Sequence, residues 1–82
     1  MYLHIGKNCV IKEKEIIGIF DIEKIHKTPE YMNLAKKLEE EKNLLDISLN
    51  QKNSFILTKE KNVIKGYVSN IGTNTMKKRK IV

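Results

Sequence analysis

Residues 54–68 read SFILTKEKNVIKGYV, two strand-forming runs joined by a short polar turn, and they decide the fold. In the first run, Phe55 and Leu57 fall on one side of an extended chain, because side chains alternate between the two faces of a strand. The residues between the runs, 59–62, are Lys, Glu, Lys and Asn, which suit a turn. The stretch predicts a β-hairpin with strands at 54–58 and 63–68.

The residues before the hairpin predict a helix and one more strand. Thr28, Pro29 and Glu30 provide a hydroxyl N-cap, a proline in the first turn and an acid near the positive end of the helix dipole. We expect a helix from about Pro29 to Lys42 that packs one apolar stripe on the sheet. The stripe consists of Tyr31, Leu34, Ala35 and Leu38. Apolar and polar residues then alternate over 44–49 (LLDISL), which predicts a strand with one solvent-exposed face.

Three short apolar runs at the N-terminal end predict strands at 2–5 (YLHI), 9–11 (CVI) and 16–20 (IIGIF). Gly18 lies inside the third run, where we expect a bulge or the close approach of a neighbouring backbone. After the hairpin, a short basic helix beginning near Asn74 or Thr75, or a basic tail, ends the chain. The fold class is therefore α+β, a small and mostly antiparallel sheet in the order βββαβββ with one amphipathic helix.

The length and composition indicate one globular domain, 1–82, because 82 residues cannot form two cores. Self-association would bury further surface. A content of 40% hydrophobic and 32% charged residues excludes both a disordered tail and a membrane protein. The N-terminal residues lack the pattern of a secretory signal, and the single cysteine, Cys9, is expected to pack as a small hydrophobe. We expect a cytoplasmic protein.

The positive charge is concentrated near the C-terminal end. Sixteen Lys and Arg face ten Asp and Glu, a net charge of +6, but four of the cations stand together at 77–80. Without those four, twelve cations remain against ten acids, a balance of only +2. A local basic patch indicates an anionic partner such as nucleic acid, and the alternative is a solvated tail that aids solubility.

Double-stranded DNA is the partner that these cations suit, through contacts to its phosphates. Few aromatic residues are present to stack on bases, so backbone contact is favoured over base readout. The candidate DNA-binding residues are Lys12, Lys14, Lys52, Lys77, Lys78, Arg79 and Lys80.

Catalytic patterns are missing from the sequence. The only histidines are His4, expected on an exposed strand face, and His26, expected in a polar loop. Asp21 and Glu23 are interpreted as a solvated turn rather than a pair of catalytic acids. No zinc, haem or dinucleotide spacing occurs, so we expect no enzyme, catalytic residue, metal, cofactor, small-molecule substrate or membrane partner.

Four segments, in order, resemble the family of the extracellular-matrix regulatory proteins RemA and RemB over nearly the whole chain. They are residues 1–6 (MYLHIG), 16–21 (IIGIFD), 52–58 (KNSFILT) and 75–79 (TMKKR). The resemblance implies a bacterial, cytoplasmic, non-enzymatic DNA-binding regulator of biofilm-matrix genes. It also implies a ring-shaped homo-oligomer, which would multiply weak phosphate contacts.

The chain departs from RemA-like members at two places. Those members carry arginines before the third strand and in the turn after the central strand, whereas this chain has Glu15 at the first place and Asn50 and Gln51 at the second. Lys52 alone keeps a charge in that turn. The departure places the chain nearer RemB than RemA. Together with the acidic helix end at 39–41, it motivates an alternative function, an oligomeric protein-interaction module without direct DNA binding.

Overall fold

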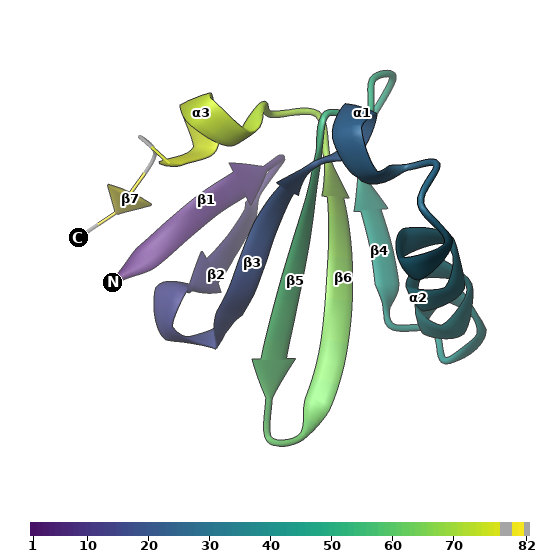
Figure 1. The fold of residues 1–82 in the computed structure, drawn as a ribbon. Helices are drawn as coiled ribbons and strands as arrows, with labels where there is room; N and C mark the ends of the chain where they lie inside the picture. The colour runs from purple at the N-terminus through teal and green to yellow at the C-terminus, as the bar shows by residue number, and fades with distance from the viewer. Residues whose placement is uncertain (78–79, 82) are drawn as a thin grey trace.

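A computed structural model describes residues 1–77 and 80–81 and shows the expected α+β class. The N-terminal elements are β1 (Tyr2–Gly6), β2 (Cys9–Lys12), the 3₁₀ helix η1 (Glu13–Glu15), β3 (Ile16–Asp21), α1 (Ile22–Ile25) and α2 (Pro29–Glu40). The C-terminal elements are β4 (Leu44–Ile47), β5 (Ser54–Glu60), β6 (Val63–Ser69), α3 (Thr73–Lys77) and β7 (Lys80–Ile81). Figure 1 shows the hairpin β5–β6 at the centre, with β1 and β2 on one side and the helix α2 on the other.

The strands form two sheets rather than the single sheet that was expected. One has the order β2-β1-β7 and the other the order β3-β5-β6-β4. All pairs are antiparallel except β4 with β6, which is parallel. β3, β4 and β6 therefore run in one direction and β5 in the other. The helices α1 and α2 connect β3 to β4, and β5 connects the parallel neighbours β4 and β6.

The predicted hairpin is confirmed, with Phe55 opposite Val68 and Leu57 opposite Gly66. Its turn is shorter than expected, because β5 continues through Glu60 and only Lys61 and Asn62 remain between the strands. Both turn residues have positive φ, 51° and 67°, the pattern of the two-residue turns whose twist matches a hairpin.

The four-stranded sheet carries a hydrophobic core on each face. On one face, the side chains of β1, β2 and α3 pack against Ile56 of β5, and this core consists of Leu3, Ile5, Ile11, Ile56 and Met76. On the other face, α1 and α2 cover the sheet over a second core that consists of Ile22, Leu38, Phe55 and Val68. Alternation along β5 supplies both cores, because Phe55 and Ile56 point to opposite faces.

The helix α2 begins as predicted and ends two residues early. The Thr28 hydroxyl accepts a hydrogen bond from the Tyr31 N–H, 3.2 Å away, which is the expected N-cap. At the other end, Lys42 takes a left-handed φ of 61°, and the Asn43 N–H donates to the Leu38 carbonyl over 2.8 Å. This is a Schellman closure made without glycine, so the usual glycine signal for a helix end was missing.

Two other expectations need correction. Asp21 and Glu23, interpreted as a solvated turn, instead begin α1, which the Asp21 carboxylate caps by accepting from the Glu23 N–H. The strand predicted over 44–49 stops at Ile47, since Ser48 turns inward to hydrogen-bond Asp46. The bulge expected at Gly18 is confirmed, because the β3–β5 register shifts between Ile16 and Gly18.

Candidate functional site

The predicted DNA-binding cations fall into two separate groups, and the first lies at the Tyr2 end of β1. Lys12 on β2 stands opposite Tyr2, and Lys14 follows in η1, with both lysines exposed. The backbone of β7 pairs with the other side of β1 and places Lys80 opposite Leu3. We call Lys12, Lys14 and the backbone position of Lys80 the basic edge.

The basic segment at 77–80 is described only in part. Lys77 is the last residue of α3, and Lys80 the first of β7. Lys78 and Arg79 lie outside the described residues, so their predicted DNA contacts stay predictions. Of this segment, the backbone of Lys80 is placed on the basic edge by its pairing with β1.

Lys52 forms the second group, at the opposite end of β1. It lies in the loop between β4 and β5, where the Asn53 N–H donates to the Ser69 carbonyl and ties the loop to the end of β6. Gly6, at the far end of β1 from Tyr2, stands against Ser69. Four residue steps along β1 span roughly 13 Å at about 3.3 Å per residue. A single copy therefore does not unite Lys52 with the basic edge.

Asp46 forms an ion pair with Lys52. Its carboxylate lies 3.8 Å from the Lys52 ammonium nitrogen, with side-chain exposures of 64% for the lysine and 49% for the aspartate. Hydrogen bonds from the Ser48 hydroxyl and N–H lower the pKa of Asp46, and the charges of Lys52 and Lys7 lower it further. Asp46 thus stays ionised and partly neutralises Lys52. Lys7 is a cation that sequence reasoning missed at this end, although its place in the expected turn after the first strand was a signal of exposure.

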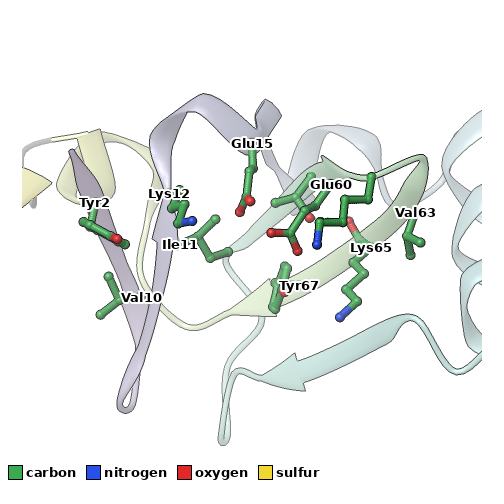
Figure 2. Close-up of a pocket in the computed structure, with 11 residues that line it drawn as sticks. Tyr2, Val10, Ile11, Lys12, Glu15, Glu60, Val63, Lys65 and Tyr67 are labelled. Atoms are coloured by element: carbon green, nitrogen blue, oxygen red, sulfur yellow. The ribbon is translucent and has the colours of Figure 1, made fainter.

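A groove of about 410 Å³ separates β2 and η1 from the β5–β6 hairpin (Figure 2). Glu15 reaches toward Glu60 across it, with Tyr67 and Ile11 below them (Figure 2). A hydrogen bond to the Glu60 carboxyl raises the pKa of Glu15, and desolvation and the charge of Glu60 act in the same direction. Lys12, together with further lysines of the hairpin, also lines the groove. Sequence reasoning missed this pairing, because Glu60 was assigned to a turn.

The described residues show no arrangement typical of catalysis. No three His, Cys, Asp or Glu side chains among residues 1–77 and 80–81 gather in a way that would hold a metal ion. His26 lies in the turn that follows α1, and its Nδ1 is hydrogen-bonded to the Ile22 carbonyl. Cys9 is half-buried, and burial raises the pKa of its thiol, so it is poorly activated as a nucleophile.

No helix in the part of the chain that the structure describes is long and apolar enough to span a membrane.

The sequence profile of the RemA-like family, described as extracellular matrix regulatory protein A-like, matches residues 2–79. The chain belongs to the RemA-like family. The match extends from β1 through α3 and includes Lys12, Lys14 and Lys52, while Lys80 lies just beyond it. RemA-like proteins are a family of regulators and not of enzymes, and the resemblance noted in the sequence is confirmed at this level. A comparison with curated proteins gave no match.

Proposed function

We propose that this RemA-like protein is a DNA-binding transcriptional regulator of extracellular-matrix (biofilm) genes, which acts in the cytoplasm as a ring-shaped homo-oligomer. The observation that carries the proposal is the family match over residues 2–79. Within the family we place the chain nearer RemB than RemA, because Glu15, Asn50 and Gln51 stand where RemA-like members have arginines.

Contacts to phosphates are the proposed mode of binding. The basic edge presents Lys12 and Lys14, with the backbone of Lys80 paired to β1. Lys77, Lys78 and Arg79 are proposed as further contacts from the sequence. Each cation that meets a phosphate releases counterions from the duplex, which is favourable at low salt and independent of base sequence. The basic edge is therefore proposed as the main contact, and Lys52 as a weaker one because of Asp46.

Assembly of several copies would compensate for the small number of cations in each. Once one copy is bound, the others engage the duplex at high effective concentration. Large apolar side chains also remain exposed on the monomer, and a second copy would cover some of them. They include Tyr2, Val10, Ile17, Leu45 and Val63.

Fluorescence anisotropy with a labelled duplex tests the proposal at low salt. The double variant Lys12→Glu with Lys14→Glu is expected to bind at least about tenfold more weakly, since it removes two phosphate contacts and adds two repulsive charges. The matched control is Lys36→Glu with Lys37→Glu, which makes the same charge change on the exposed side of α2. Equal losses in the two variants would show that the basic edge is not the contact.

The second candidate function is an oligomeric protein-interaction module without direct DNA binding. The ion pair between Asp46 and Lys52 favours it, as does the carboxyl of Glu15 close to the basic edge. If this function is correct, a pull-down recovers a protein partner while the purified protein ignores duplex DNA at low salt.

A further inference from the structure

We propose that copies of this chain meet head to tail, with the acidic end of helix α2 of one copy seated on the lysine-rimmed groove of the next. The groove is the one between β2 and the β5–β6 hairpin. The acidic helix end consists of Glu39, Glu40 and Glu41, all of which are exposed. This inference rests on the proposed function, which includes a ring of copies, and it adds the two surfaces that would form the interface.

Three lysines stand along the rim of the groove. Lys12 belongs to β2, whereas Lys61 and Lys65 belong to the turn and the second strand of the hairpin. The carboxyl groups of Glu15 and Glu60 also line the groove, so three positive charges stand against two negative ones when both acids are ionised. Lys65 is exposed and points away from the two carboxyl groups in Figure 2, so its ammonium group is available to an incoming anion. The rim therefore suits an acidic occupant.

The groove also exposes large apolar side chains to water. Three of them line it and remain nearly half exposed, namely Tyr2 at 44%, Val10 at 45% and Val63 at 43%. Exposed apolar side chains that gather in one place indicate contact with another molecule, whereas isolated ones do not. The groove thus suits an occupant that brings apolar surface together with acidic groups, which a small inorganic anion does not.

The acidic helix end is unfavourable within one copy. The last carbonyl groups of a helix carry partial negative charge, and Glu39 and Glu40 lie in the last turn of α2, with Glu41 at its C-cap. No ion pair among residues 1–77 and 80–81 holds these three carboxylates. Lys42 follows them, so residues 39–42 carry three negative charges and one positive charge, a net charge of −2. A positively charged partner would offset this repulsion.

Helix α2 also carries an exposed apolar side chain in line with its acids. Met32 is 55% exposed and stands seven residues before Glu39, so the two lie on the same side of the helix, roughly 10 Å apart along its axis. Methionine adapts readily to irregular apolar surfaces. One side of the helix thus combines carboxylates with an apolar side chain, which complements the lysine rim and the apolar lining of the groove.

The two surfaces lie on different faces of the four-stranded sheet. The strands β1 and β2 pack on one face, and α2 covers the other (Figure 1). A copy that places its helix end on a neighbour therefore keeps its own groove open for a further copy. Such head-to-tail contacts form a ring when the rotation between copies closes. A contact between two identical grooves would instead bring lysines against lysines.

Charge reversal with rescue tests the inference, and light scattering during size-exclusion chromatography measures assembly. The groove variant is Lys61→Glu with Lys65→Glu, and the helix variant is Glu39→Lys with Glu40→Lys. Each should need at least about tenfold more protein to assemble than the wild type, because like charges would then face each other. An equimolar mixture of the two variants should assemble again, and so should the quadruple variant, since opposite charges then meet with their signs exchanged.

The matched control is Lys24→Glu with Lys27→Glu, which makes the same charge change at two exposed positions in and after α1 and should assemble like the wild type. If both reversed variants assemble as readily as the wild type, the interface lies elsewhere, and the proposed ring still stands. If both lose assembly and neither the mixture nor the quadruple variant restores it, the two surfaces do not meet each other, and the groove takes a different occupant. If the wild type itself stays monomeric, the ring of the proposed function fails together with this inference.

Discussion

Ser69→Ala tests how the two sheets are held together. The Ser69 side chain is fully buried at the end of β6, where its hydroxyl donates to the Ile5 carbonyl of β1. The same oxygen accepts from the Ile71 N–H over 3.0 Å. One side chain thus joins the sheet that holds the basic edge to the sheet that holds the hairpin.

The expected loss follows from the groups left without partners. Alanine removes both hydrogen bonds, and each buried polar group left unsatisfied costs about 1–3 kcal/mol. Because the Ile71 amide is only partly buried, we expect a total of about 2–4 kcal/mol. A domain of this length has a free energy of unfolding of roughly 4–12 kcal/mol, so the variant should lose a large fraction of it.

Urea unfolding followed by circular dichroism measures this loss directly. The midpoint should fall, with the slope m unchanged, because the same surface is exposed on unfolding. Thr75→Ala is the control, since it removes an exposed hydroxyl from α3 and should change stability by less than about 0.5 kcal/mol. If Ser69→Ala changed the free energy of unfolding by as little as the Thr75→Ala control does, the proposed link between the sheets would be refuted.

Three further predictions concern stability. Asp46→Asn should lower the free energy of unfolding at neutral pH, because the lowered pKa of this carboxyl stabilises the fold fully above the pKa of the unfolded chain. This stabilisation is lost as the pH falls through the lowered pKa, so the difference between the two proteins should shrink in acid; urea unfolding at several pH values measures this. Gly66→Ala should lower the free energy of unfolding by about 1–3 kcal/mol in the same assay, since the added Cβ would lie 2.7 Å from the ring of Phe55. Gly72→Ala is the control and should be close to neutral, because no atom lies within 4 Å of a Cβ at that position. Glu60→Gln should raise the midpoint of thermal unfolding at neutral pH by removing repulsion from Glu15. This gain should disappear as the pH falls through the raised pKa of Glu15. An equal gain at all pH values would show that the two carboxyl groups do not interact.

The elements that depend on neighbouring residues could be predicted from the sequence. The hairpin follows from two β-rich runs around a polar turn, and the start of α2 follows from Thr28 and Pro29, whose capping role is local. The bulge at Gly18 was predicted for the same reason, because a glycine inside a strand weakens it wherever the strand pairs.

The features that depend on distant residues could not be predicted. The division into two sheets rests on β1 pairing with β7 rather than with the central hairpin, and the approach of Glu15 to Glu60 rests on the pairing of β3 with β5. Neither pairing leaves a local pattern. The separation of Lys52 from the basic edge has the same origin, since it depends on which end of β1 each loop meets. The candidate site was therefore predicted as a set of residues and not as a surface.

The most direct test of phosphate contact by the RemA-like protein is the salt dependence of its affinity for duplex DNA. Anisotropy titrations of the wild-type protein over a series of salt concentrations give the slope of log K against log salt concentration. We predict a linear fall with a slope of about −0.9 for each phosphate contact, hence about −2 or steeper for the two lysines of the basic edge alone. A slope near zero, or no binding at the lowest salt concentration, would contradict the proposed phosphate contact.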